Sequence, residues 1–567
     1  GLTAAPSYAQ AAVGSAAVDT WYVRPASACT FNGDGLSYGC AASAGAAGAF
    51  NALSNIIWTV TTGVDDGDTL YICGVQRGDR IILGSAGGAS ESARITISWS
   101  CPGDPGTIRA TTDMSEALIS GNWTNEGGNL WYLSVASYTG KDPVRVWFDG
   151  VPQFPSNNKA NLGTTGGTGQ GPLGIWWYDS ANSRLYLYST INPASTFSSL
   201  ESLVYGVGSC RNAAICGLSA SNIYLDFVNP VIQGGAVAGF RSSGGSYIRI
   251  YGTTTDRNNC QFSDVARGIA FTDSDGIGTG SVGVGNQVYN CTFNQSIPVS
   301  HSAYWWEYGY GWGDGVDLKY GVTNSVIYNN TFTNFAHTAV EILANAGTTS
   351  VTGNVIRNNT FTCESHVPYC RAYGTDGVAI GRASNNLFYS NTINNMATRT
   401  QINGDANTVT SNLFLNQRQN GLYLTRTESI ELQGYAGPSQ NNIFANNTFY
   451  SNPFAPCISF RSDTGTKSGN IIANNILIDC GGASYTSGYE NVAVSIPVAV
   501  DIGNNTFKNN AVYSSAQTNT VYYKATGKTT IAGFQSACSG DTCTSNLTSN
   551  PLTISSTDMN LQPLSPA

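Results

Sequence analysis

A five-residue phrase built on asparagine returns along most of the chain, and it constrains the fold more than any other feature. It reads NNCQF from 258, YNCTF from 289, YNNTF from 328, RNNTF from 357, YSNTI from 389, TSNLF from 410, ANNTF from 445, ANNIL from 473 and GNNTF from 503. Its anchor residues are Cys260, Cys291, Asn330, Asn359, Asn391, Asn412, Asn447, Asn475 and Asn505. The mean step between anchors is about 31 residues, which is typical of a solenoid.

Each phrase combines an apolar strand, an Asn at a tight bend, and a Thr and apolar residue that return to the core. If successive coils stack about 4.8 Å apart, the Asn side chains lie above one another and hydrogen-bond as a ladder. We therefore expect an all-β chain that forms a right-handed parallel β-helix. A propeller or a leucine-rich solenoid lacks support, because neither a WD-like signature nor an L-x-x-L-x-L frame is present.

Composition agrees with many short strands and excludes some partners. Charged residues make up 11% of the chain, compared with about 25% in an average globular protein. The formal charge of -9 and the pI near 4.9 argue against nucleic acid and anionic membranes, which both favour basic surfaces. The sequence contains no apolar run of 18 or more residues, so it predicts no membrane-spanning helix.

Five segments follow from changes in this pattern. We expect residues 1–18 to be a disordered lead-in or the remnant of an export signal, and residues 19–117 to form an amino-terminal cap and the first coils. Residues 118–205 break the coil rhythm with amphipathic and aromatic strands, so we expect an inserted antiparallel β module. The main β-helix occupies 206–515, and 516–567 form a terminal coil or cap that covers an open edge.

The 14 cysteines indicate disulfides rather than a zinc site. Several lie at short loop spacings, namely Cys29/Cys40, Cys210/Cys216, Cys363/Cys370 and Cys538/Cys543. No CxxC is followed by a second metal-binding pair, so loop-closing disulfides in an oxidising compartment fit better. Free thiols stacked inside the core are the alternative.

The segment Asp314-Gly-Val-Asp-Leu-Lys319 is the centre of the candidate site. We align it with the segments that begin at Arg267, Thr338, Asp376 and Asn420. Strand alternation then directs Val316 and Leu318 inward and places Asp317, Lys319, Glu341 and Tyr423 on one outer face. His337 precedes the strand of Glu341 and should lie over Gly313 and Asp314.

Two carboxylate spacings follow from this alignment. Asp317 and Glu341 should be one coil apart, at about 5 Å, whereas Asp314 and Asp376 should be two coils apart, at about 10 Å. The close pair suits a retaining glycosidase or a divalent cation, and the wider pair suits an inverting hydrolase. Purely structural roles are the alternative: Asp-Gly turns, a surface ion ladder, and a hydrogen-bonded loop histidine.

A dense group of aromatic residues lies next to this segment. We expect it either to stack on sugar rings or to form a subunit contact. The expected substrate-binding residues are Trp305, Trp306, Tyr308, Tyr310, Trp312, Arg371, Arg382 and Tyr423.

The chain resembles the pectate-lyase-like superfamily of right-handed parallel β-helix proteins, which includes polysaccharide lyases, galacturonase-type hydrolases and phage tailspike depolymerases. The resemblance covers residues 19–117 and 206–520, and rests on the Asn bends and on DGVDLKYGVTNSVIYNNTF. GDGVDLK is similar to the D-G-x-x-x-K stretch of some lyases. That likeness implies Lys319 as the base, with Asp314, Asp317 and Glu341 as ligands of Ca²⁺.

DGVD is also similar to the N-T-D-G-I-D segment of galacturonase-type hydrolases. The next coil should then offer an Asp-Asp pair, but it has His337-Thr338, and neither Gly-His-Gly nor Arg-Ile-Lys follows. The departure argues against that hydrolase family and leaves another hydrolase on the same fold open.

Three functions follow. The first is an extracellular enzyme that cleaves a polysaccharide by β-elimination or hydrolysis, with catalytic candidates Asp314, Asp317, Lys319, His337, Glu341 and Asp376. The second is a phage tailspike on a virion tail, which binds a bacterial surface glycan. The third is a non-catalytic adhesive β-helix. We expect a monomer, or a homotrimer if the chain is a tailspike.

Overall fold

The computed structural model describes most of the chain. The described residues are 18–59, 62–136, 143–153, 156, 158–163, 175–204, 213–234, 238–253, 259–265, 267–272, 282–295, 313–335, 337–344, 350–365, 370–377, 383–397, 399–418, 428–434, 437–463, 465–481, 492–497, 502–515, 518, 520–524 and 527–550. Within them, no helix is long and apolar enough to cross a membrane.

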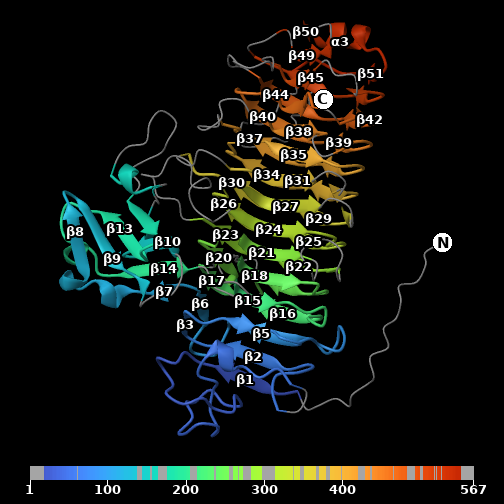
Figure 1. Cartoon of the computed structure of the whole chain (residues 1–567). Helices are drawn as coiled ribbons and strands as arrows, with labels where there is room; N and C mark the ends of the chain where they lie inside the picture. The colour runs from blue at the N-terminus through green and yellow to red at the C-terminus, as the bar shows by residue number, and fades with distance from the viewer. Residues whose placement is uncertain are drawn as a thin grey trace.

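Three long sheets run along the molecule, and each coil adds one strand to each sheet (Figure 1). Sheet 1 contains β1 (Thr20–Val23), β2 (Thr69–Ile72), β5 (Ile95–Ser98), β16 (Leu225–Val228), β19 (Arg249–Tyr251), β22 (Gln287–Tyr289), β25 (Val326–Tyr328), β29 (Val355–Arg357), β33 (Leu387–Tyr389), β36 (Thr408–Thr410), β39 (Ile443–Ala445), β43 (Ile471–Ala473), β47 (Thr506–Lys508) and β51 (Thr542–Thr544).

Sheet 2 carries the candidate site. It contains β4 (Ile81–Ile82), β15 (Ala213–Gly217), β18 (Ala238–Ser243), β21 (Arg267–Thr272), β24 (Asp314–Lys319), β27 (Thr338–Ala344), β31 (Tyr373–Gly377), β35 (Thr400–Asn403), β38 (Ile430–Gln433), β41 (Ile458–Phe460), β45 (Val494–Ile496), β49 (Val521–Tyr523) and β50 (Gly527–Thr529). All neighbours in this sheet pair in parallel except β49 and β50, which are antiparallel.

Sheet 3 completes each coil. It contains β3 (Val75–Arg77), β6 (Thr107–Arg109), β17 (Val231–Gln233), β20 (Gln261–Ser263), β23 (Thr292–Asn294), β26 (Thr331–Thr333), β30 (Thr360–Thr362), β34 (Thr392–Asn394), β37 (Leu413–Leu415), β40 (Thr448–Asn452), β44 (Ile476–Cys480) and β48 (Ala511–Tyr513). Short pairs join β28 (Val351–Thr352) to β32 (Ala383–Ser384) and β42 (Lys467–Ser468) to β46 (Ile502–Gly503). The predicted right-handed parallel β-helix is confirmed.

Identical core positions stack from coil to coil. Most strands of sheets 1 and 3 have three residues, of which the middle one is buried. In sheet 3 these middle residues include Phe262, Phe293, Phe332 and Phe361, whose ring centroids are 4.7–5.1 Å apart and nearly parallel. Each ring therefore covers the next, and the apolar core continues along the solenoid axis.

The asparagine ladder exists, and each rung uses the whole amide. The Asn359 backbone N–H and Nδ2 both donate to Oδ1 of Asn391, at 2.9 and 3.1 Å, and Nδ2 also donates to the carbonyl of Ile327. The buried ladder continues through Asn330, Asn359, Asn391, Asn412, Asn447, Asn475, Asn510 and Asn546. The left-handed conformation belongs to the residue before the rung, such as Asn358 with φ 55°.

One predicted rung was placed in the wrong ladder. Asn505 belongs to a second ladder five residues upstream, which contains Asn354, Asn386, Asn407, Asn442, Asn470 and Asn505. GNNTF at 503 precedes β47 of sheet 1, whereas ANNTF at 445 precedes β40 of sheet 3. The same phrase thus forms both corners that flank sheet 1, and the local sequence does not distinguish them.

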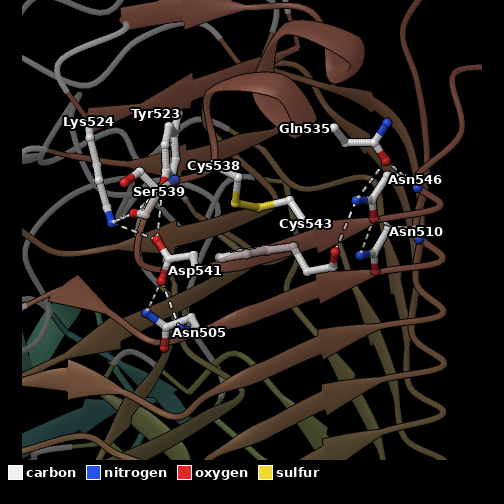
Figure 2. The surroundings of a disulfide bond; sticks show 11 residues. Asn505, Asn510, Tyr523, Lys524, Gln535, Cys538, Ser539, Asp541, Cys543 and Asn546 are labelled. Carbon is white, nitrogen blue, oxygen red and sulfur yellow. Dashed lines mark hydrogen bonds and ion pairs between the residues drawn. A yellow bond between two sulfur atoms is a disulfide. The ribbon is translucent and has the colours of Figure 1, made fainter.

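The ladders end on a carboxy-terminal cap around α3 (Ile531–Ala537), and Figure 2 shows both ends. Asn546 donates its backbone N–H to Oε1 of Gln535 at 2.7 Å. Asn505 donates to Oδ1 of Asp541, whose Oδ2 accepts from Lys524 Nζ at 2.6 Å. A side-chain oxygen therefore accepts the last donor of each ladder.

Six disulfides are present among the described residues, where no cysteine is free. Three close loops at the predicted spacings, Cys29–Cys40, Cys363–Cys370 and Cys538–Cys543. Three others join segments farther apart, Cys73–Cys101, Cys260–Cys291 and Cys457–Cys480. Cys260 and Cys291 occupy the ladder position of their coils, so a covalent bond replaces the amide rung there. Cys210 lies outside the described residues.

An antiparallel module projects from the side of the solenoid (Figure 1). One sheet has the order β11 (Val151–Pro152), β10 (Pro143–Phe148), β14 (Leu200–Val204) and β7 (Thr112–Asp113), and the other has β12 (Trp176–Asp179), β13 (Arg184–Tyr188), β9 (Leu130–Ser134) and β8 (Trp123–Gly127). Trp123, Leu133, Phe148, Trp176 and Leu187 form a core separate from that of the solenoid. The inserted antiparallel module is therefore confirmed.

Short 3₁₀ turns complete the described elements. They are η1 (Leu53–Asn55), η2 (Ser115–Ala117), η3 (Ser120–Asn122), η4 (Lys159–Asn161) and η5 (Pro193–Ser195).

Removing one rung should destabilise the coil above and below it. Asn391→Ala leaves both donors of Asn359 without their acceptor in a buried site, so we expect a loss of at least about 2 kcal/mol in unfolding free energy. Thermal denaturation and amide exchange at Asn359 measure the effect. Ser365→Ala, at an exposed position, is the control. If the amide exchange rate of Asn359 is the same in Asn391→Ala as in the parent, the ladder does not stabilise neighbouring coils.

Candidate functional site

Six ionisable side chains meet on the outer face of sheet 2, across β21, β24 and β27. They are Arg267, Asp314, Asp317, Lys319, His337 and Glu341. Strand pairing places Arg267 beside Asp314, and Asp317 beside Glu341. The predicted alignment of these three strands, and the coil spacing of Asp317 and Glu341, are therefore confirmed.

Two glycines allow Asp314 to join this outer face. Val316 and Leu318 point into the core, and strict alternation would direct Asp314 inward with them. Gly315 faces inward as well, since a Cβ there would lie 2.3 Å from the Ala339 carbonyl and 2.7 Å from the Phe332 ring. The preceding Gly313 has φ 63°. Asp314-Gly315 is thus the irregular start of β24 and not the turn that its dipeptide predicts.

The contacts of the cluster alternate in charge. Lys319 Nζ lies 3.0 Å from Asp317 Oδ2 and 2.6 Å from Glu341 Oε2. Arg267 Nε lies 3.0 Å from Asp317 Oδ2 and 3.6 Å from Asp314 Oδ2. His337 Nδ1 lies 2.6 Å from Asp314 Oδ1. Three potential cations therefore face three carboxyl groups.

These groups are much more buried than a surface ion ladder would be. Asp317 has no exposed surface, and the Asp314 side chain is 1% exposed. Arg267 and His337 are the open members of the cluster, with 28% and 22% of their side chains exposed. The outer surface of the cluster is therefore cationic, and its carboxyl groups lie below.

The pKa values of the two aspartates are shifted in opposite directions. Burial raises the pKa of Asp317 to about 7, and although Lys319 and Arg267 oppose this shift, the charges of Asp314 and Glu341 add to it. Burial also acts on Asp314, but the charge and hydrogen bond of His337 outweigh it and lower the pKa of Asp314. Near neutral pH, Asp314 is therefore ionised while Asp317 carries a proton in part of the molecules.

Three carboxyl oxygens in this pair have no hydrogen bond. Asp314 Oδ2 and both oxygens of Asp317 are buried and accept no hydrogen bond from the described part of the chain, although Asp317 Oδ2 lies 3.0 Å from Lys319 Nζ. A buried carboxyl oxygen without a hydrogen bond is costly, which is common where a substrate or water completes the site.

The cations are held in their charged forms. Burial alone would lower the pKa of His337, but the charge and hydrogen bond of Asp314 raise it to about 9. Burial is likewise outweighed in Lys319, whose pKa is raised by Asp317 and Glu341. A lysine that remains protonated cannot abstract a proton, so these contacts argue against Lys319 as the base of an elimination.

The donor set does not fit Ca²⁺. Asp314, His337 and Glu341 offer one ligand atom each within 4.8 Å of one another. Calcium takes six to eight oxygen ligands, whereas this group includes an imidazole, and Lys319 already neutralises Glu341. We therefore assign no step to a cation.

Other predicted site residues separate into three groups. The alignment of Asp376 with Asp314 is wrong by five residues, because Asp376 pairs with Leu343 and Gly374 pairs with Glu341. Arg371 is 6% exposed and near enough to His337 to oppose the rise in its pKa. The remaining substrate-binding candidates Trp305, Trp306, Tyr308, Tyr310, Trp312, Arg382 and Tyr423 lie outside the described residues.

Arg267 was missing from the predicted site residues. Its signal was present, since Arg267-Gly-Ile aligns with Asp314-Gly-Val at the same corner of the preceding coil. A cation one coil before an acidic motif is in contact distance of it when strands stack in register.

Comparison with known proteins gives only distant likenesses. No family model matches the sequence, and no curated protein matches it. Among solved structures, a protein described as XylC in complex with xylose is 13% identical, with a TM-score of 0.41 over 89% of this chain and 86% of that one. A mannuronic acid specific polysaccharide family 6 lyase from human gut microbiota is 11% identical, with a TM-score of 0.34 over 81% and 78%.

The tailspike of E. coli bacteriophage HK620, in complex with a hexasaccharide, is 12% identical with a TM-score of 0.32 over 57% of this chain and 54% of that one. At these identities and TM-scores, the likenesses assign neither a reaction nor a substrate.

The His337–Asp314 pair should make stability depend on pH. The folded-state pKa of His337 is raised from 6.5 to about 9, so its contribution is complete below pH 6.5 and is lost as pH rises through 9. The shift corresponds to about 3 kcal/mol. Urea unfolding at pH 6, 8 and 10 should show that the parent exceeds His337→Gln most at pH 6. A difference that is constant over this range would reject a charged His337.

Proposed function

We propose that the chain is a glycoside hydrolase that cleaves a polysaccharide, with Asp317 as general acid and Asp314 as general base. The observation that carries the proposal is that two aspartates meet at Arg267 on one sheet face, in environments that shift their pKa values in opposite directions. Environments that push two carboxyl pKa values apart are typical of an acid and base pair. Two carboxyl groups are also what most glycosidases use.

In this proposal Asp317 Oδ1 and Asp314 Oδ2, two of the oxygens without a hydrogen bond, supply the two proton transfers. Asp317 gives its proton to the glycosidic oxygen, and the bond from that oxygen to the anomeric carbon breaks. Asp314 Oδ2 takes a proton from the water that adds to the anomeric carbon. His337 holds Asp314 through its other oxygen, so Oδ2 remains the acceptor.

The cations orient this pair and meet the substrate. Arg267 and His337 form the solvent side of the cluster, so they contact the sugar first. Because Arg267 also faces Asp317, we propose that it withdraws when the glycosidic oxygen reaches the acid. Lys319 and Glu341 fix Asp317 from the other side.

The disulfides support an extracellular location, where a polysaccharide substrate would be met. Six disulfides are typical of proteins that fold in an oxidising compartment. We propose that the protein is secreted and meets its polymer outside the cell.

Loss of either aspartate should remove turnover. Asp317→Asn and Asp314→Asn should each lower kcat by about 10²- to 10⁴-fold, because each removes one proton transfer. Reducing ends released from a panel of neutral and uronate polysaccharides measure activity, and the absorbance of unsaturated products reports elimination. Asp19→Asn, at an exposed position just before β1 and outside the cluster, is the matched control.

Three outcomes would contradict the proposal. Unsaturated products would indicate a lyase, and binding without cleavage of any polysaccharide would favour an adhesin or a non-cleaving tailspike. Lys319→Arg tests the base: it keeps the positive charge but cannot accept a proton, so we expect it to lose less activity than Asp317→Asn. A loss as large as that of Asp317→Asn would restore Lys319 as a catalytic group.

The pH dependence of activity should reveal the ionisation of the proposed general acid, Asp317. Because the pKa of Asp317 is about 7, kcat/KM should fall above pH 7 as the acid loses its proton. The pKa of Asp314 is below its usual 3.8, so activity should persist to pH 4. Initial rates from pH 3 to 10, with stability checked at each pH, measure both limbs. A profile that rises through pH 8 would exclude Asp317 as the acid.

A further inference from the structure

The inserted module contains a pocket of its own, away from the charged cluster. Asn129, Leu130, Lys159, Ala160, Leu162 and Tyr188 line an open hollow of about 490 Å³ on the surface of the module. This volume lies within the range of small-molecule sites in proteins. Its residues come from β9, β13, the β8–β9 turn and η4, so both strands and a helical turn build it.

The lining combines one aromatic ring with a few polar groups. Gly163, with φ 71°, packs on the Tyr188 ring, where a Cβ would lie 2.1 Å from the ring carbons. Asn129 Nδ2 donates to the Tyr188 hydroxyl at 3.0 Å, which fixes the ring from its other end. Leu130 and Leu162 supply aliphatic surface. A fixed ring beside amide and hydroxyl groups suits the apolar face and hydroxyl edge of a pyranose.

The charge of the pocket is balanced. Lys159 is the charged residue among the lining residues, and it forms an ion pair with Glu126 and lies 4.5 Å from the Tyr186 ring centroid. Since its ammonium already has a carboxylate partner, the pocket offers no net charge to an acidic sugar. The chemistry favours an uncharged pyranose.

Polar contacts anchor the module to the solenoid. Glu201 of β14 accepts from Arg77 at 3.0 Å and from Arg109 at 2.6 Å. Arg145 of β10, which is 4% exposed, donates to the carbonyl of Asp264 at 3.0 Å. The pocket is therefore carried at a defined position beside the solenoid.

We propose that this pocket is a second glycan site, which binds an uncharged pyranose unit of the polysaccharide cleaved at Asp314 and Asp317. The inference rests on the proposed function. It adds a site that holds the polymer at a distance from the reacting bond.

Binding to an uncleaved polymer tests the site in the full chain. Asp317→Asn serves as the background, so that the polysaccharide stays intact. The probes are neutral xylo- and cello-hexasaccharides and acidic galacturono- and mannurono-hexasaccharides, measured by titration calorimetry with the insoluble polymers in parallel. Adding Tyr188→Ala or Asn129→Ala should weaken binding of a neutral hexasaccharide by about tenfold. Ser134→Ala, exposed on the same strand as Leu130, is the matched control.

Separate readouts distinguish the two proposals. With Asp317 intact, Asn129→Ala should raise KM for the polymer by more than it raises KM for a trisaccharide. Neutral binding that is lost in Tyr188→Ala supports the pocket even if no polysaccharide is cleaved, which would sink the hydrolase alone. Equal affinity of Asn129→Ala and the Ser134→Ala control, or a preference for the acidic probes, would overturn the pocket proposal. Asn129→Ala keeps the test valid if Tyr188→Ala fails to fold.

Discussion

The hydrogen bonds of the two asparagine ladders set the spacing on which the rest of the structure depends. Each rung satisfies buried donors of one coil with an oxygen of the next, so neighbouring coils cannot separate without leaving those donors unbonded. The paired strands and the stacked phenylalanine rings repeat with the same spacing from coil to coil. Residues far apart in the sequence, such as Asp317 and Glu341, become neighbours because of that spacing.

The charged cluster uses this regularity and also departs from it. Register brings Arg267, Asp314 and Thr338 to one level, and Gly315 then lets the chain bend so that Asp314 leaves the core side. The resulting carboxyl groups are buried on an outer face, where burial raises their pKa values and neighbouring charges shift them further. At Asp314 the charge and hydrogen bond of His337 outweigh burial, whereas at Asp317 burial and the neighbouring carboxylates outweigh Lys319 and Arg267, so chemically equal side chains behave differently.

Sequence reasoning predicts the fold well because the phrase repeats a physical requirement at every coil. It predicts three strands of the site for the same reason. It fails for Asp376, because a D-G-V triplet fits several strand positions and carries no register of its own. It also misses the burial of Asp317, which depends on neighbours from three coils, and it merges two ladders whose corners have the same sequence.

The ladders are also directional. In the rungs from Asn447 to Asn510, the backbone N–H and Nδ2 donate to the next coil toward the carboxy terminus, while Nδ2 also donates to a carbonyl of the preceding coil. The last coil of a ladder therefore has donors that require an acceptor. The side-chain oxygens of Gln535 and Asp541 accept these last hydrogen bonds, and within the described residues neither one donates to a further coil of the ladder. The cap therefore ends the solenoid by matching its polarity: a copy that lacked these two oxygens would leave hydrogen-bond donors of its last coil unbonded, where an acceptor from another molecule could bind them.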